Sequence, residues 1–524
     1  MTLELGGKCP AIVSDGDLTE GITHEAASLA GHLKLGKLIY LYDNNHISIE
    51  GSTSLAFTED VGMRFEAYGW HVLRVEDGND LDAIEQAIRA AQAVTDRPSL
   101  IVVTTTIGYG SPNKAGTSKV HGSPLGADEV QRTKEALGWP LEPTFYVPDD
   151  VLAFFRQAVE RGAAWQQGWQ ENWTQWAARN PALGQQWQQM MSDELPDGWE
   201  ADLPIFEPGD KPIATRNASS KVINAIARHF PGFVGGSADL DPSTKTYQKD
   251  YPSFQADERS GRNLHFGVRE HGMGGIANGM AVHGGLIPYT GTFLVFSDYM
   301  RPSIRLAAIS EFPTIFIFSH DSIGLGEDGP THQPIEQIMS LRLIPHLEVY
   351  RPADANETAA AWRCAMQNRD RATVLLLTRQ NVPVLDPAGI LEGVEHGAYV
   401  LAEADGGQPE IVLIATGSEV HLALDAQKLL TGQGVRARVV SMPSWERFEI
   451  QPEDYRNSVL PPGVPRIAVE AGITTGWQKW VGSTENIVGI NRFGASAPYK
   501  EIYQQLKLTP QYIAELAQGL LTRA

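Results

Sequence analysis

The chain has 524 residues, which is too many for one hydrophobic core, and a prior of about 150 residues per domain indicates roughly three domains. Its composition is that of a globular protein, and the formal net charge of −21 excludes the basic surface that a nucleic-acid or anionic-membrane binder needs. Only two cysteines occur, Cys9 and Cys364, which excludes a disulfide framework and favours a reducing compartment. Since the first residues do not form a signal peptide and no run of about eighteen apolar residues occurs, we expect a cytoplasmic protein without membrane spans.

Short apolar, β-branched runs alternate with helical patterns along the chain, and Leu81–Val94 is one such predicted helix. The predicted strands are Ala11–Val13, Lys37–Tyr42, Ser99–Thr106, Thr314–Ser319, Ala372–Thr378, Glu410–Ala415, Val435–Ser441 and Arg466–Glu470. Their apolar residues are continuous rather than alternating, which indicates strands buried on both faces of parallel sheets. We therefore expect an α/β fold of doubly wound domains, with ligands outside the carboxyl ends of the strands.

Two segments are predicted to separate the domains. Asp193–Pro212 is rich in Asp, Glu, Pro and Gly, and Val384–Gly397 contains Pro and Gly between a strand end and a new helix–strand series. The expected layout is a first domain at 1–190, a linker at 191–212, a second domain at 213–384 and a third at 385–524.

A tryptophan stripe precedes the predicted linker. Trp165, Trp169, Trp173 and Trp176 are spaced by four, four and three residues, with Trp187 further on, and this spacing puts the first four on one helical face. We interpret the stripe as packing against a domain surface rather than as a ligand-stacking site.

The end of the first predicted strand carries a candidate metal site. Asp15 supplies a carboxylate, Asn45 a side-chain carbonyl just past the second strand, and Ile47 a backbone oxygen, which are the oxygen ligands that a hard divalent cation takes. Gly16 lets backbone N–H groups approach a phosphate at the start of a helix. With Ser14 in place of its first glycine, this SDG…NN pattern resembles the thiamine diphosphate motif GDG…NN, and the serine fits if its φ is negative.

Longer segments carry a more specific resemblance. They are VGGSADLDPS (Val234–Ser243), FGVREHGM (Phe266–Met273), YTGTFLVFSDY (Tyr289–Tyr299), SHDSIGLGEDGPTHQ (Ser319–Gln333) and LLTRQN (Leu376–Asn381). Together they resemble the pyrimidine-binding domain of transketolases. Dihydroxyacetone synthases share much of the pattern, whereas deoxyxylulose-phosphate synthases match these segments less well.

This resemblance implies the thiamine-diphosphate-binding fold and transfer of a two-carbon ketol unit from a ketose phosphate to an aldose phosphate through a thiamine diphosphate carbanion. It implies thiamine diphosphate with Mg²⁺ (or Ca²⁺ or Mn²⁺) as cofactors, sugar phosphates as substrates, and a place in the pentose phosphate pathway. It also implies a homodimer with active sites at the subunit interface.

The resemblance assigns roles to individual residues. Glu270 would activate the cofactor through its pyrimidine N1′, and Phe293, Phe296 and Tyr299 would hold the pyrimidine. Asp239 and Leu240 would lie near the thiazolium, and Glu20 and Glu25 would link the two active sites of the dimer. The substrate-binding positions would be Arg216, Ser243, His320, Asp328, His332 and Arg379. His320 and His121 are the candidates for proton transfer.

The family's first domain begins well upstream of its GDG motif, whereas the strand that ends at Asp15 starts almost at the first residue here. We therefore expect a truncated first domain whose sheet has an exposed edge. Three alternatives stay open: a short active transketolase, one chain of a split enzyme that needs an N-terminal partner, and a catalytically impaired paralogue that binds cofactor or acts as a scaffold. The retained Asp15, Asn45, Glu270 and Asp328 favour activity.

Overall fold

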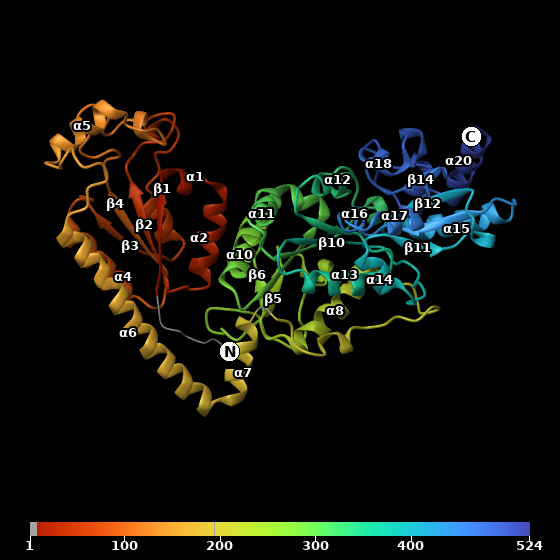
Figure 1. Cartoon of the computed structure of the whole chain (residues 1–524), viewed down its shortest axis with the longest axis horizontal. Coiled ribbons are helices and arrows are strands. Elements are labelled where there is room, and N and C mark those ends of the chain that lie inside the picture. Colours follow the sequence, from red (N-terminus) through yellow and green to blue (C-terminus); the bar gives the residue numbers. More distant parts are fainter. Residues whose placement is uncertain (1–7, 193, 524) are drawn as a thin grey trace. The chain divides into compact units, whose positions relative to one another are not determined.

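The computed structural model describes residues 8–192 and 194–523, which divide into two compact units. The first unit runs to Gln185 and includes Gln255–Arg259, and the second holds the remainder of the chain. Within the described residues the strands build three sheets (Figure 1). Residues 1–7, where no signal peptide is expected, lie outside the described residues. In the described part of the chain, no helix is both long and apolar enough to cross a membrane.

The sheet of the first unit is parallel and has the order β1-β2-β4-β3. Its strands are β1 (Cys9–Ser14), β2 (Leu38–Asn44), β4 (Ser99–Thr104) and β3 (His71–Val75). One face packs against α1 (Asp15–Thr19), α2 (Gly21–His32) and α3 (Val61–Ala67), and the other against α4 (Leu81–Ala93) (Figure 1). Strand β1 lies at an edge of this sheet, and the side chain of Ile12 is 80% exposed.

The first sheet of the second unit is also parallel, with the order β6-β5-β7-β8-β10-β9. Its strands are β5 (Phe233–Ser237), β6 (Asn263–His265), β7 (Ile287–Phe293), β8 (Ile315–Ser319), β9 (Glu348–Tyr350) and β10 (Thr373–Leu377). Helices α8 (Thr215–His229) and α13 (Ala355–Gln367) pack on one face, while α10 (Glu270–His283) and α11 (Ser297–Ile309) lie on the opposite side (Figure 1). Phe233, Tyr289 and Trp362 fill the core between α13 and the sheet.

The last sheet has the order β11-β13-β12-β14-β15, and only the edge strand β11 pairs antiparallel. The strands are β11 (Tyr399–Ala402), β12 (Ile411–Ala415), β13 (Ala437–Ser441), β14 (Arg466–Val469) and β15 (Ile487–Val488). Helices α15 (Glu419–Thr431), α19 (Tyr499–Gln505) and α20 (Pro510–Arg523) cover one face. Helices α16 (Trp445–Glu449), α17 (Glu453–Val459) and α18 (Gln478–Val481) cover the other. All three sheets are thus covered on both faces, as the continuous apolar runs predict.

The other helices connect these layers. They are α5 (Ala127–Ala136), α6 (Asp149–Arg179), α7 (Pro181–Met191), α9 (Asp241–Thr244), α12 (Gln337–Arg342) and α14 (Ile390–Glu395). Every predicted strand is confirmed to within a few residues, and Leu81–Val94 is confirmed as α4. Two details differ: Asp15 and Gly16 already belong to the first turn of α1, and β2 extends to Asn44.

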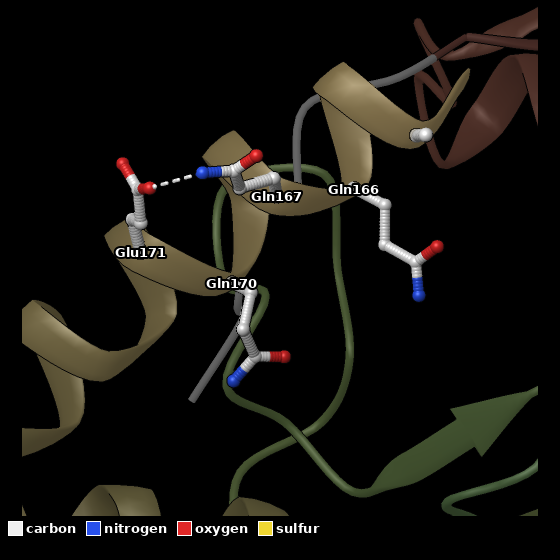
Figure 2. Close-up of a pocket in the computed structure, with 5 residues that line it drawn as sticks. Gln166, Gln167, Gln170 and Glu171 are labelled. Carbon is white, nitrogen blue, oxygen red and sulfur yellow. Dashed lines mark hydrogen bonds between the residues drawn. The ribbon is translucent and has the colours of Figure 1, made fainter. Parts of the chain in front are cut away.

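The long helix α6 carries the tryptophan stripe. Trp169 stacks on Trp173 with ring centroids 6.1 Å apart, and Trp173 stacks on Trp176 at 5.4 Å, so these three share one face. Among the described residues none of α6 is buried, and packing of the stripe against a domain surface stays a prediction. A shallow depression of about 350 Å³ on this helix is lined by Gln166, Gln170 and neighbours. Figure 2 shows these side chains and the hydrogen bond that Gln167 Nε2 donates to Glu171 Oε1.

Gly236, in the VGGSADL segment, is required because β5 and β6 approach closely there. A Cβ at this position would lie 1.7 Å from the backbone oxygen of Leu264. We expect Gly236→Ala to lower the free energy of unfolding by about 1–3 kcal/mol, since strands β5 and β6 would have to separate. Thermal unfolding measures the change. Gly279→Ala in the exposed part of α10 is the matched control, because its Cβ meets no atom within 4 Å. Equal destabilisation by both substitutions would contradict this account.

Candidate active site

In the first unit, the carboxyl ends of β1 and β2 hold Asp15 and Asn45 close in the fold, because Ser14 pairs with Asp43 across the two strands. Asp15 is 3% exposed, and its Oδ1 accepts a 2.6 Å hydrogen bond from the hydroxyl of Tyr42. Its buried Oδ2 accepts no hydrogen bond from any described residue. A buried carboxylate oxygen without a donor fits a cation ligand.

Asn45 lies in a turn that fixes its amide. Its Oδ1 accepts a 3.0 Å hydrogen bond from the backbone N–H of Ile47, and its Nδ2 donates to Asp43 Oδ2 at 3.2 Å. A depression of about 360 Å³ begins beside this turn and is lined by Asp15, Gly16, Glu20, Ser48 and neighbours. Asn45 and Ile47 are not among its lining residues. The free oxygen of Asp15 and this polar depression fit a bound divalent metal and diphosphate.

Ser14, which replaces the first glycine of the motif, has φ −119° and therefore needs no glycine. Its backbone N–H and its hydroxyl both donate to Asp17 Oδ2, at 2.8 and 2.9 Å. This contact anchors the start of α1 and positions Asp15 and Gly16 at its first turn. The serine thus preserves the local geometry that the motif needs.

His121 lies in a loop that Glu129 holds in place. The buried carboxylate of Glu129 accepts hydrogen bonds from Ser111 Oγ at 2.5 Å and from the backbone and side chain of Asn113, both at 2.9 Å. These bonds, first from Asn113 and then from Ser111, lower the pKa of Glu129 to about 2. Glu129 stays ionised and keeps the loop attached to α5. Glu129 carries no distinctive sequence signal, because it lies in an ordinary acidic first helical turn.

In the second unit two arginines are brought together by the threonines that precede them. The backbone N–H of Thr215 donates to Thr378 Oγ1 at 2.9 Å, and that of Thr378 donates to Thr215 Oγ1 at 2.7 Å. Both threonines are fully buried. This reciprocal pair fixes Arg216 and Arg379 side by side, although they are far apart in sequence. The shared Thr-Arg dipeptide is the one sequence signal that could have revealed the pair.

Arg216 also connects to the β5–α9 segment, since its Nη1 donates to the backbone oxygen of Ser243 at 2.7 Å. Burial, followed by the nearby charge of Arg379, lowers the pKa of Arg216. Two guanidinium groups held against their mutual repulsion form an anion-binding site.

An aromatic cluster adjoins these arginines. The ring of Phe293 lies 3.8 Å from that of His320 and stacks on Phe296 at 5.8 Å. The ring of His332 is 5.7 Å from Phe296, and that of Tyr299 is 6.1 Å from it. The structure thus brings five of the predicted site residues into one surface that suits a flat heteroaromatic ring.

His320 is neutral in this setting. Burial, then Arg216 and Arg379, lower its pKa from 6.5 to about 3. Its Nδ1 is hydrogen-bonded with Ser319 Oγ at 2.9 Å, which leaves Nε2 for a ligand. A neutral imidazole at this position donates or accepts one hydrogen bond and adds no third positive charge.

We expect His320→Gln to reduce kcat/KM by a factor that does not change between about pH 5.5 and pH 8.5, because His320 does not titrate in that range. The pH profiles of the wild type and the variant should therefore be parallel. A loss that changes across the ordinary histidine pKa would show that His320 takes up a proton in the active enzyme.

The remaining predicted residues of the second unit lie at loops and helix starts. Glu270 is buried as the first residue of α10, after Arg269, whose backbone oxygen accepts from Met273 N at 2.8 Å. Asp239 has a left-handed backbone with φ 61° and is exposed, and Leu240 is half-buried. Asp328 is exposed on the loop between β8 and α12.

Three family descriptions match the chain in succession. Residues 8–196 match the transketolase thiamine diphosphate binding domain, residues 211–384 the transketolase pyrimidine binding domain, and residues 397–509 the transketolase-like C-terminal domain. Together with the three mainly parallel sheets, these matches place the protein among the thiamine-diphosphate-binding enzymes.

Similarity to individual proteins identifies the family within this class of enzymes. The chain is 54% identical over 515 residues to a transketolase of Geobacillus stearothermophilus, covering 98% of this chain and 77% of that protein. Structures of a Leishmania mexicana transketolase and of a Pichia stipitis transketolase in complex with sedoheptulose 7-phosphate each match with a TM-score of 0.95 and 44% identity. Each match covers 98% of this chain and 76% of the other. The chain belongs to the transketolase family.

Proposed function

We propose that the protein transfers a two-carbon ketol unit from a ketose phosphate to an aldose phosphate. The observation that carries this proposal is the Arg216–Arg379 pair, fixed by Thr215 and Thr378 next to the neutral His320. A paired guanidinium site binds a phosphate bidentately, whereas a neutral histidine suits a sugar hydroxyl or phosphate oxygen.

The metal and the diphosphate are assigned to the first unit. Asp15, Asn45 and the backbone oxygen of Ile47 would hold Mg²⁺, and Gly16 would face the diphosphate beside Glu20. The free Oδ2 of Asp15 supports this ligand set. When bound, thiamine diphosphate supplies a nucleophilic carbon and an electron sink for cleaving and forming the bond next to the ketose carbonyl.

The pyrimidine side is assigned to the second unit. Glu270 would hold a proton at the pyrimidine N1′, and Phe293, Phe296 and Tyr299 would pack against the ring, with Asp239 and Leu240 near the thiazolium. The position of Glu270 supports this assignment, because its side chain is buried at the first residue of α10.

The substrate is assigned to polar groups around the arginine pair. Arg216, Arg379, Ser243 and His320 would bind the phosphate end, and Asp328 would read hydroxyl configuration. His332 would line the entrance, and His121 would assist oxygen stabilisation or proton transfer. The neutral state of His320 favours hydrogen bonding over donation of a proton from an imidazolium.

Arg379→Gln tests the phosphate assignment. We expect the KM for a ketose phosphate donor to rise about 10- to 100-fold, since a hydrogen bond between charged groups contributes about 1.5–3 kcal/mol. The kinetics with hydroxypyruvate as the donor and a phosphate-free aldehyde as the acceptor should stay at the wild-type level. Steady-state assays with both donors, in the presence of thiamine diphosphate and Mg²⁺, give the comparison.

Arg371→Gln is the matched control, because Arg371 precedes β10 while Arg379 follows it, and Arg371 pairs with Asp370 instead. Equal losses with both donors in Arg379→Gln, or a similar loss in Arg371→Gln, would remove the support for a phosphate site at Arg379. Absence of any ketol transfer by the wild type alone would favour the split or scaffold alternatives.

The other expectations stay predictions. These are the domain boundaries at residues 190, 212 and 384, the homodimer, the role of Glu25 between two active sites, the cytoplasmic location and the pentose phosphate pathway.

A further inference from the structure

The loop 319–333, which carries His320, Asp328 and His332, starts in an unfavourable backbone conformation. His320 has φ 61°, a left-handed value that is unfavourable for a residue with a side chain and persists only when its surroundings hold it. The residue that follows, Asp321, is 1% exposed, and its backbone N–H donates to the oxygen of Leu377 at 3.3 Å. The contacts of Asp321 therefore constrain the backbone directly after His320.

The side chain of Asp321 pairs with Arg351, the residue directly after β9. Arg351 Nε donates to Asp321 Oδ2 at 2.9 Å, and its Nη2 lies 2.9 Å from the same oxygen. The arginine is fully buried. A buried guanidinium with a buried carboxylate beside His320 is costly unless its other donors are satisfied.

Those other donors reach the C-terminal sheet. Arg351 Nη1 donates to the backbone oxygen of Thr416 at 3.0 Å and pairs closely with Glu419, and it lies 3.8 Å from Glu470 Oε1. A backbone hydrogen bond makes a second connection between the same segments, since Gly417 N donates to the backbone oxygen of Arg351 at 3.0 Å. A Cβ on Gly417 would lie 2.6 Å from Arg351 Cζ, so the glycine makes room for the guanidinium.

The carboxylates of Glu419 and Glu470, which face Arg351 from the C-terminal sheet, are themselves fixed by hydrogen bonds. Glu419 accepts hydrogen bonds from Tyr503 OH at 3.0 Å and from the backbone N–H of Ala471 at 3.0 Å. Glu470 accepts two hydrogen bonds from Arg342, at 2.9 and 3.0 Å. The cluster thus joins the carboxyl ends of β8, β9, β12 and β14, which come from two different sheets.

The far end of the loop is fixed to the same C-terminal region. Gln333 Nε2 donates to the backbone oxygens of Gly326 and Ala495, both at 2.9 Å. Ser496 Oγ donates to the backbone oxygen of Glu327 at 2.5 Å. Both ends of the loop therefore depend on contacts with the C-terminal sheet and its following segment.

We infer that Arg351 is a positioning residue which, through Asp321, holds His320 in its left-handed conformation and ties the substrate-binding loop to the C-terminal sheet. The inference rests on the proposed role of His320 in substrate binding. It gives the C-terminal domain a part in the reaction, since Glu419 and Glu470 fix the arginine that fixes the loop.

Asp321→Asn is the variant that tests this. It removes a charge but leaves Arg351 and Arg342 facing Glu419 and Glu470, a balanced set, so the protein should fold. We expect kcat/KM for a ketose phosphate to fall about 10- to 100-fold, mainly through KM, because a small displacement of a binding group costs this much. Hydroxypyruvate should be affected less. A purely structural role of Asp321 would not change the ratio of the kcat/KM values for the two donors.

A double-mutant cycle separates this inference from the function it rests on. In a His320→Ala background, Asp321→Asn should add no further loss, since its effect passes through His320. Equal losses in both backgrounds, or wild-type kinetics in Asp321→Asn, would overturn the positioning role. Wild-type kinetics in His320→Ala would instead refute the proposed substrate contact.

Asp354→Asn is the matched control. Asp354 is fully buried like Asp321, but its carboxylate caps α13 and accepts from Glu357 N and Leu385 N at 2.8 and 2.9 Å. Asp354→Asn should lower thermal stability without changing the ratio of kcat/KM for the ketose phosphate to kcat/KM for hydroxypyruvate. Should Asp321→Asn not fold, Glu419→Gln loosens Arg351 from the opposite side, and it must show the same KM change with the ketose phosphate. Unchanged KM in that variant would overturn the inference.

Discussion

Replacing Glu270 by alanine is expected to lower kcat for ketol transfer by about 10²- to 10⁴-fold, the range lost when a positioned acid or base is removed. The buried carboxyl at the first residue of α10 is the proposed partner of the pyrimidine N1′. Its loss would remove the group proposed to hold the proton there, while Phe293 and Phe296 would keep their stacking. We therefore expect turnover to fall far more than cofactor affinity, measured by steady-state assay and by titration with thiamine diphosphate.

Glu392→Ala is the matched control for Glu270. Glu392 is also an acid in the first turn of a helix, α14, but it is exposed. It should keep wild-type turnover. If Glu270→Ala retained full activity, the assignment of the cofactor activator would be wrong. If the wild type bound thiamine diphosphate and transferred no ketol unit, the scaffold alternative would be favoured instead.

The sequence predicted the central strands because their apolar runs are continuous. Ile411–Ala415 and Thr373–Leu377 are buried along their whole length, as such runs require. Most of the strands that were missed are short or lie at edges, whereas the central strand β7 (IPYTGTF) was missed because Pro, Thr and Gly interrupt its apolar run. His71–Val75 is an edge strand interrupted by an exposed arginine, and β6 and β9 have three residues each. Too few residues contribute there for a pattern to emerge.

The site was predictable where a motif names the residue and unpredictable where a contact joins distant segments. The motifs identified Asp15, Glu270 and the two arginines. The hydrogen bond from Tyr42 to Asp15 depends on strand register, and the Thr215–Thr378 pair joins positions 163 residues apart. Arg351 appears in sequence as an ordinary charged residue after a short strand. Arg351 is buried only because the carboxyl ends of β8, β9, β12 and β14 come together around it.

The largest effect in the first unit is expected at Asp15. Asp15→Asn keeps one oxygen that can accept from the hydroxyl of Tyr42. It removes the negative charge of the carboxylate, whose buried Oδ2 has no donor among the described residues. The dissociation constant of thiamine diphosphate at saturating Mg²⁺ should rise at least about 10²-fold, since removing one partner of a buried charge pair costs about 3–5 kcal/mol. Calorimetric titration with and without Mg²⁺ measures it.

The dependence on Mg²⁺ distinguishes a metal ligand from a residue that only supports the fold. If Asp15 binds the cation, Asp15→Asn should weaken cofactor binding with Mg²⁺ while leaving the weak binding without Mg²⁺ unchanged. Asp82→Asn, an exposed acid in the first turn of α4, should change neither. A variant that loses affinity equally with and without Mg²⁺ would contradict the metal assignment. The bond from Tyr42 would then stand as a structural contact between β2 and α1.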